Sequence, residues 1–459
     1  MRRQAWAISM ALLLVTSCSS VTSGQGSLED TDAEPGVEAC PDVPVPPAAD
    51  RPVIDLRFEL DDDARTVTGT ESVRFTPDIA TDELVFRLTA NQPLSVAAGS
   101  GIEVGEVTGE DVEGSDFESA GAEESTQGGL LVVRLGASLE PGQSTEVGIE
   151  FELRLGDGTF DRFGHDPQSS WWGSGHPLLA WEPGQGWRRE PLVDSLGETA
   201  TSPAADTTVS VLAPTGRTVL MTGGAEEVRE DGRQTLWRSS SPTARDVSVA
   251  VGEFTVAEGS VGDSRLFVGA EDADAAAELL DQVSTAVDAL RQYFGAFPYD
   301  RLTVARLDDY GGGIEYPAMI LLAGPGDTVL IHEVAHMWFY GMVGNDQGSN
   351  PWLDESFATY AEGLVSGHRV DPGALQQTLD VGLPIGEFPG AETYIDIVYG
   401  KGSAMLDRAR EESGADVFDA AIRCYVNANA WQIASPEDVE TALQELPAAL
   451  DVLRGAGAL

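Results

Sequence analysis

The sequence predicts two folded parts, an antiparallel β-rich part followed by an α/β part that is mainly helical. Three observations favour this division. A chain of 459 residues is expected to hold two or three domains. Apolar and polar residues alternate through much of residues 51–260, which is the period of a half-buried strand. After about residue 261 the apolar period lengthens to that of a helix.

The first 18 residues have the pattern of a targeting segment. Arg2 and Arg3 precede an apolar run that is too short to span a bilayer. The run ends in LVTSC, which resembles a bacterial lipobox with Cys18 as the lipidated residue. We therefore expect residues 1–18 to be a lipoprotein signal peptide and the protein to be anchored to the outer face of the cytoplasmic membrane. Ordinary secretion with an incidental Cys18 is the alternative.

Residues 19–50 are rich in Ser, Gly, Pro and acidic residues, a composition that predicts a disordered linker. If Cys18 carries lipid, Cys40 and Cys424 remain of the three cysteines. An exported compartment permits a disulfide between them. The sequence does not tell whether they meet, and two unpaired thiols are the alternative.

Residues 51–260 predict an antiparallel, sandwich-like β domain. Apolar side chains alternate with charged ones in its first run, at Ile54, Leu56, Phe58 and Leu60. Residues 100–128 are rich in Gly and acidic residues and are expected to form a long loop or an insertion. Four of the nine tryptophans fall between Trp171 and Trp187, and we expect them to pack in a core rather than to form a binding platform.

Residues 261–459 predict an α/β domain dominated by helices. Apolar residues from Leu279 to Phe294 repeat at helical spacing, and residues 302–307 read as a strand that leads to a glycine run. The formal net charge of the whole chain is −49. This charge argues against nucleic acid as a partner, because the phosphate backbone would be repelled.

Residues 331–338 (IHEVAHMW) hold a metal-binding pattern. His332 and His336 are four residues apart, so on a helix both imidazoles lie on one face and can reach one ion. The carboxylate of Glu333 can then reach a water on that ion. A catalytic zinc usually takes a third protein ligand. Glu355 is the candidate, because Asn350-Pro351 predicts a helix start just before it. A surface helix with chance histidine spacing is the alternative.

These segments, HEVAH and then WLDESFATYAE, resemble the gluzincin aminopeptidases, the family of aminopeptidase N and the leukotriene hydrolases. Residues 311–317 (GGGIEYP) resemble the exopeptidase motif of that family, although Ile314 and Tyr316 stand where Met and Asn are commonest. Residues 399–402 (YGKG) resemble its YxKG motif, and their Lys401 is the only lysine in the chain. The order and spacing of the motifs match those of the family.

The resemblance implies that the second part is a thermolysin-like, mainly helical zinc-peptidase domain. It implies one Zn²⁺ per chain, held by His332, His336 and Glu355. Glu333 would activate the zinc-bound water, and Tyr399 would stabilise the oxyanion. Larger relatives continue into a long helical superdomain, which we do not expect here because few residues follow the predicted zinc helices.

The resemblance also implies where a substrate lies. Glu315 would bind the free amine of a peptide, and Gly312 and Gly313 would line its backbone. Glu182 is a candidate for a second amine-contacting residue. The expected function is a zinc-dependent aminopeptidase that acts on peptides outside the cytoplasm. A thermolysin-type zinc endopeptidase and a catalytically inactive surface module of the same fold remain as alternatives, and the oligomeric state stays open.

Overall fold

A computed structural model describes residues 40–157, 162–193, 201–307, 310–324 and 327–459 of the chain. The predicted signal peptide, the site of lipidation at Cys18 and most of the predicted linker lie outside the described residues. Among the residues that are described, no helix has both the length and the apolar composition that crossing a bilayer requires.

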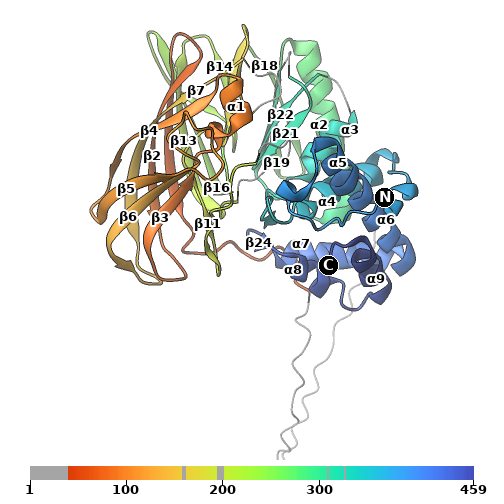
Figure 1. Cartoon of the computed structure of the whole chain (residues 1–459). Coiled ribbons are helices and arrows are strands. Elements are labelled where there is room, and N and C mark those ends of the chain that lie inside the picture. The colour runs from red at the N-terminus through yellow and green to blue at the C-terminus, as the bar shows by residue number, and fades with distance from the viewer. Residues whose placement is uncertain (1–39, 158–161, 194–200, 308–309, 325–326) are drawn as a thin grey trace, which may run out of the picture. The chain divides into compact units, whose positions relative to one another are not determined.

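The N-terminal part is built from β-sheets, as the alternating pattern predicted (Figure 1). A seven-stranded sheet has the order β15-β16-β13-β1-β2-β7-β4, and a four-stranded sheet has the order β10-β3-β6-β5. Apolar side chains of both sheets belong to one buried core. All neighbouring strands of these two sheets are antiparallel except β1 and β13, which pair in parallel. A second four-stranded sheet has the order β14-β17-β9-β8.

The strands of this part have the following bounds: β1 Val53–Leu60, β2 Thr66–Phe75, β3 Thr81–Arg87, β4 Gly101–Thr108, β5 Val112–Glu118, β6 Leu130–Leu139, β7 Thr145–Arg154, β8 Phe163–His165, β9 Ser169–Gly173, β10 Leu178–Leu179, β11 Trp181–Glu182, β12 Gly186–Trp187, β13 Ala205–Pro214, β14 Thr218–Met221, β15 Glu226–Asp231, β16 Gln234–Ala244 and β17 Ser248–Gly252. One short helix, α1 (Pro93–Ala97), lies between β3 and β4.

The prediction of a long loop at residues 100–128 is wrong, because β4 and β5 lie within this segment. Both are edge strands of their sheets. Most side chains of β5 are exposed or half-buried. Gly and acidic residues suit an edge strand, because charges on its open side oppose pairing with another chain. The composition that suggested a loop is therefore that of a solvated sheet edge.

The tryptophans of the N-terminal part pack in the core, as predicted. Trp171 and Trp172 are fully buried, and the ring of Trp172 meets Phe58 edge to face with centroids 5.6 Å apart. Trp181 and Trp187 pack against each other at 4.7 Å between centroids.

A charged cluster is buried beside this core. His176 follows β9, and its Nδ1 lies 3.5 Å from the Glu71 carboxylate of β2. Its Nε2 lies 3.7 Å from Asp246, whose second oxygen accepts a hydrogen bond of 2.5 Å from the Ser174 hydroxyl. All four side chains are almost completely buried. Such a buried ionic cluster is stable only because each charge has a partner of opposite sign.

The C-terminal part contains a five-stranded sheet in the order β18-β19-β20-β22-β21. The pairs β19–β20 and β20–β22 are parallel, whereas β21 adds antiparallel to β22 at the edge. β18 already pairs with β19, so the change of sheet lies between β17 and β18, a few residues before the predicted boundary at 260–261. The bounds are β18 Thr255–Val261, β19 Ser264–Ala270, β20 Arg301–Arg306, β21 Gly313–Tyr316, β22 Met319–Leu322, β23 Gly344–Asn345 and β24 Ile433–Ala434.

Helices make up most of the rest of this part, and the core that they share with the sheet is the largest of the molecule. Their bounds are α2 Ala273–Phe294, α3 Asp327–Ala335, α4 Trp352–Ser366, α5 Ala391–Tyr394, α6 Gly402–Ser413, α7 Ala415–Ala428, α8 Pro436–Ala442 and α9 Pro447–Ala456. A π-helical segment, η4, spans Ile395–Lys401 between α5 and α6.

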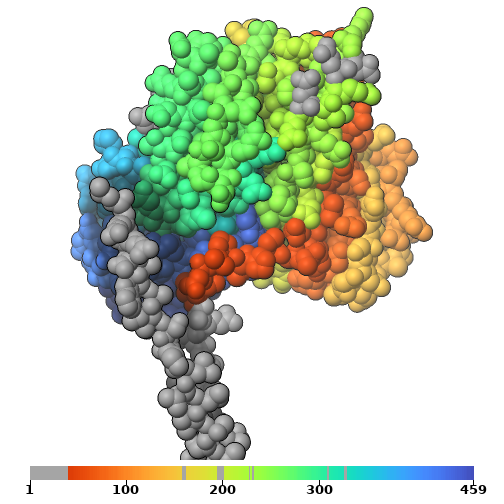
Figure 2. Space-filling model, turned by 180° about the vertical axis from the view of Figure 1, so that it is seen from behind, coloured from red at the N-terminus to blue at the C-terminus, as the bar shows by residue number. Residues whose placement is uncertain are grey.

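The last residues of the predicted linker are not a free spacer. We call residues 40–51 the N-terminal strap; Figure 2 shows it in red, running from the blue C-terminal helices to the β-rich part. Cys40 forms a disulfide with Cys424 of α7. The backbone N–H of Val45 donates to the carbonyl of Asn427 at 2.9 Å. At its other end, Arg51 pairs with Asp206 of β13 at 2.7 Å. These bonds fix a segment whose composition alone suggests disorder.

Candidate active site

Three potential metal ligands converge where α3 and α4 meet. Nε2 of His332 lies 3.1 Å from Nε2 of His336, and the two nitrogens lie 3.2 and 3.4 Å from Oε2 of Glu355. Ligands of a tetrahedral zinc with bonds of about 2.0–2.1 Å are about 3.3–3.4 Å apart. The spacing of the three donor atoms therefore fits one zinc ion, and their N/N/O chemistry is that of a catalytic zinc site.

Local helix geometry explains the two histidines. His336 follows the last residue of α3, and its N–H still donates to the carbonyl of His332 at 3.3 Å, so the helical spacing continues through it. Nδ1 of His336 is 3.1 Å from the carbonyl of Phe339. An N–H at Nδ1 that donates to this carbonyl leaves Nε2 as the atom with a lone pair toward the metal.

Glu355 lies in the first turn of α4. The helix begins at Trp352 with Pro351 as its N-cap residue, one position later than predicted. The N–H of Glu355 donates to the carbonyl of Pro351 at 3.2 Å and to the carboxylate of Asp354 at 2.8 Å. The entry of the chain into α4 therefore sets the position of the third ligand.

The buried carboxylates around the two histidines favour a bound cation. Burial lowers the pKa of His336, but the carboxylates of Glu315, Glu355 and Glu333 outweigh this effect and raise it above its usual value. Burial raises the pKa of Glu355, but its hydrogen bonds to the two histidines outweigh this and lower the pKa. Three carboxylates buried so close together cost free energy unless a cation compensates them. A divalent metal would do so.

Glu315 of the edge strand β21 lies close to Glu333 of α3. Their carboxylates and one nitrogen of His336 all lie within 4.8 Å of one another. A Cβ at Gly313 would lie 2.4 Å from Oε1 of Glu333, so a larger residue there would displace this carboxylate from the strand. Gly312 has a φ of 121°, which a glycine adopts readily, and its carbonyl accepts a hydrogen bond from the N–H of Ala323.

Tyr399 reaches the site from the π-helical segment. Its ring stacks on the imidazole of His332, and burial together with the negative charge of Glu355 raises the pKa of the phenol well above its usual value. The hydroxyl of Ser356, next to Glu355 on α4, donates to the carbonyl of Val398 at 2.6 Å. This contact joins the segment that carries Tyr399 to the helix that carries Glu355.

Lys401 does not point at the metal ligands. Its Nζ donates to the carbonyl of Leu379 at 2.7 Å and to the carbonyl of Ala456, the last residue of α9, at 3.0 Å. The side chain is buried. The only lysine of the chain therefore fixes the π-helical segment to the C-terminal helix.

Sequence reasoning missed Glu362. Its Oε2 lies 3.9 Å from Nδ1 of His332, on the side of the imidazole away from Glu355. A carboxylate in that place orients a metal-binding histidine. The signal was present, because Glu355 and Glu362 are seven residues apart and a helix brings such positions to one face. Glu182, the candidate second amine-contacting residue, lies 3.3 Å from the guanidinium of Arg188.

The comparisons with known proteins agree with this geometry. The family model described as "Peptidase family M1 domain" matches residues 326–381, which include α3, α4 and all three potential metal ligands. This segment is similar to the M1 peptidase domain. The family implies zinc as the metal, and the donor set fits it.

Two plant enzymes are similar to this chain in sequence. Aminopeptidase M1 of Arabidopsis thaliana is 23% identical over 239 residues, which cover 43% of this chain and 27% of that enzyme. Aminopeptidase M1-B of Oryza sativa subsp. japonica is 24% identical over 255 residues, which cover 46% of this chain and 29% of that enzyme. The chain thus spans less than a third of the length of these relatives.

Solved structures resemble this chain over most of its length. The M1 zinc metallopeptidase of Deinococcus radiodurans superposes with a TM-score of 0.65 at 17% identity, covering 89% of this chain and 94% of that one. A mutant of that protein bound to a Tyr-Ser-Ala substrate superposes with a TM-score of 0.65, also at 17% identity, with coverage of 89% and 95%. At this identity the likeness supports the fold, a β-rich part followed by a mainly helical one.

Proposed function

We propose that the protein is a zinc-dependent aminopeptidase that removes N-terminal residues from peptides outside the cytoplasm. The observation that carries the proposal is the buried Glu315 carboxylate on the edge strand, within 4.8 Å of Glu333 and His336. A carboxylate there can pair with the ammonium of a peptide N-terminus, whose reference pKa is about 7.7–8.0. This pairing would bring the first peptide bond of the substrate to the metal ligands.

His332, His336 and Glu355 would hold the metal. Zinc bound there would polarise the scissile carbonyl and lower the pKa of water. Glu333, the other carboxylate in contact with the edge strand, takes the proton of the attacking water and transfers it to the leaving amine. Its contact with the backbone of Gly313 keeps the carboxylate beside the strand along which the substrate would lie.

Tyr399 is suited to bind the oxyanion. Because burial and the charge of Glu355 raise the pKa of its phenol, the hydroxyl keeps its proton at neutral pH. A protonated phenol can donate a hydrogen bond to the negative oxygen that forms at the attacked carbonyl. The stack on His332 orients the ring without using the hydroxyl.

The test compares peptides with free and blocked N-termini. We expect the wild type to cleave aminoacyl-coumarins with a free amine and barely to touch their N-acetylated forms. Loss of a desolvated charge partner costs about 2–5 kcal/mol. Glu315→Gln should therefore lower kcat/KM by about 30- to 5000-fold on free amines. Glu392→Gln is the matched control, since Glu392 is an exposed glutamate of α5.

Two outcomes would contradict the proposal. Efficient internal cleavage of blocked peptides by the wild type would favour a thermolysin-type endopeptidase. A zinc-loaded wild type that hydrolyses neither free nor blocked substrates would favour a catalytically inactive module.

We further propose that Cys18 carries a lipid that anchors the protein to the outer face of the cytoplasmic membrane. The lipobox-like sequence supports this, and so does the Cys40–Cys424 disulfide, because disulfides persist in oxidising compartments outside the cytoplasm. Cys18→Ala should move the protein from the membrane fraction to the soluble fraction or block its processing. Mass spectrometry that finds an unmodified mature N-terminus at another residue would overturn the anchor.

A further inference from the structure

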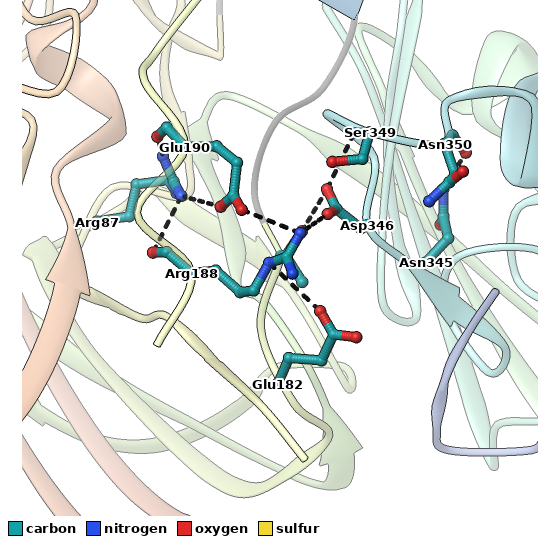
Figure 3. A network of polar contacts seen from close by, with 9 residues as sticks. Arg87, Glu182, Arg188, Glu190, Asn345, Asp346, Ser349 and Asn350 are labelled. Carbon is teal, nitrogen blue, oxygen red and sulfur yellow. Dashed lines mark hydrogen bonds and ion pairs between the residues drawn. The ribbon is translucent and has the colours of Figure 1, made fainter. Parts of the chain in front are cut away.

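We propose that Arg188 of the β-rich part is a positioning residue for the metal site: through Asp346 it fixes the turn that sets Glu355. The inference rests on the proposed role of Glu355 as a metal ligand. Arg188 lies directly after β12, and its guanidinium contacts three carboxylates (Figure 3). It pairs with Glu190 at 2.9 Å, with Glu182 at 3.3 Å and with Asp346 of the C-terminal part.

Asp346 closes the turn that precedes α4. Its second carboxylate oxygen accepts a hydrogen bond from the backbone N–H of Ser349 at 3.0 Å, and its carbonyl accepts one from the N–H of Asn350 at 2.7 Å. The carbonyl of Asn350 in turn accepts from the N–H of Leu353 at 3.2 Å. A series of hydrogen bonds therefore connects the guanidinium of Arg188, through Asp346 and Asn350, to the first turn of α4. That turn contains Glu355.

Hydrogen bonds from Arg87 of the β-rich part hold the backbone at Arg188 in place. Arg87, at the end of β3, is fully buried and donates to the carbonyl of Glu190 at 2.7 Å and to the carbonyl of Arg188 at 3.5 Å. These bonds fix the backbone of residues 188–190. The side chain of Arg188 is 22% exposed and that of Asp346 is 8% exposed, so water screens their pairing only in part.

Asp346 needs the positive charge of Arg188, because two other carboxylates share the same guanidinium. Without the guanidinium, Asp346 would share its surroundings with the carboxylates of Glu182 and Glu190 and would lack its cationic partner. An almost buried carboxylate that has lost its cationic partner is costly to keep in place and is drawn toward water. Such a movement alters the turn that its carboxylate and carbonyl now close.

The metal site is sensitive to this turn for a geometric reason. The two histidines are one helical turn apart, so their mutual position does not depend on other contacts. Glu355 is the potential ligand that comes from a different helix, and its distance from the histidines depends on how the chain enters α4. Loosening the turn at residues 346–350 therefore weakens metal binding even though Arg188 touches no ligand.

The test measures zinc affinity rather than activity alone. We expect Arg188→Met to weaken zinc binding by about 10- to 100-fold, the usual effect of removing a partner that orients a ligand. Arg189→Met is the matched control, because Arg189 is the next residue and pairs with Glu83 and Glu118 but not with Asp346. It should leave the zinc dissociation constant within about threefold, well below the effect expected at Arg188. Competition with a chelator of known affinity gives these constants.

Two further variants protect the test against a folding defect. Asp346→Asn can still close the turn through its amide oxygen but loses the ion pair, and its effect should not add to that of Arg188→Met. Arg188→Lys should recover only part of the affinity, since an ammonium cannot bind several carboxylates as the planar guanidinium does.

A wild type that binds no zinc would contradict the proposed function itself. A folded Arg188→Met or Arg188→Lys protein with wild-type zinc affinity would overturn this inference alone. An equal loss of affinity in Arg189→Met would also overturn it, because the effect would then be general to the segment.

Discussion

The phenol ring of Tyr399 lies parallel to the imidazole of His332, with ring centroids 5.7 Å apart and an angle of 9° between the planes. The stack joins the π-helical segment to the helix with both histidines. One consequence is that the packing of the Tyr399 ring can be separated from the role that we propose for its hydroxyl.

Tyr399→Phe should therefore lower kcat much more than it raises KM. The stack remains, whereas the oxyanion donor is lost, and loss of one such donor typically costs about 10²–10³ in rate. Steady-state kinetics on aminoacyl-coumarins would measure both constants, with thermal unfolding as the check on folding. An unchanged kcat would remove Tyr399 from the mechanism.

Glu333→Gln should keep the metal and lose nearly all turnover. The three potential ligands are untouched, whereas the base is replaced by a neutral amide of the same shape. Elemental analysis should find about one zinc per chain in both forms, as expected for a site with three protein ligands. In His336→Ala the site should instead be empty, because two protein ligands hold zinc poorly. If zinc were lost in Glu333→Gln, Glu333 would have to be a ligand.

Lys401→Met should lower both stability and kcat while KM changes little. The variant removes the Lys401 donor from the carbonyl of Leu379, whereas the carbonyl of Ala456 still accepts from the N–H of Val381 at 3.1 Å. A buried group left unsatisfied costs about 1–3 kcal/mol. The variant also frees the segment that carries Tyr399. Urea unfolding and steady-state kinetics would test the two effects separately. A folded variant of normal kcat would show that Lys401 stabilises the fold without aiming Tyr399.

His176 should make stability depend on pH in the alkaline range. Burial lowers its pKa, but Glu71 and Asp246 outweigh burial and raise it to about 10. The unfolded value is about 6.5. The stabilisation is therefore complete below about pH 6.5 and is lost as the pH rises through the folded pKa.

His176→Gln tests this dependence. It should lower the free energy of unfolding by about 3–5 kcal/mol near pH 6.5, because it leaves buried charges unpaired, and by less as the pH approaches 10. Urea unfolding between pH 6 and 10 gives the curve. His165→Gln is the control, since His165 is half-buried and its contact is the hydroxyl of Ser170 at 3.3 Å. Parallel curves for wild type and His176→Gln would contradict the assignment.

Local periodicity was the most informative signal in the sequence. Helical spacing alone predicted that His332 and His336 would share a face, and the structure brings them together with Glu355. Strand alternation predicted the β-rich part. Alternation did not predict the sheet to which β18 belongs, because β18 looks like the strands before it but pairs with β19. The catalytic roles of these residues stay predictions until the variants are measured.

Contacts between distant segments could not be predicted in this way. Arg188 and Asp346 are 158 positions apart, and neither stands in a periodic pattern that indicates its partner. The same holds for the N-terminal strap, whose composition is that of a disordered segment although a disulfide and hydrogen bonds fix it. In both cases the ordering comes from a partner that only the tertiary fold supplies.

The disulfide between Cys40 and Cys424 joins positions 384 residues apart. Most of both parts and all the potential metal ligands thus belong to one covalent ring, whereas α8 and α9 follow it in the chain. A protease that cuts a single peptide bond anywhere in this ring would open it without producing two separate molecules. On a non-reducing gel the nicked protein should run as one species, and only a reductant should release its fragments.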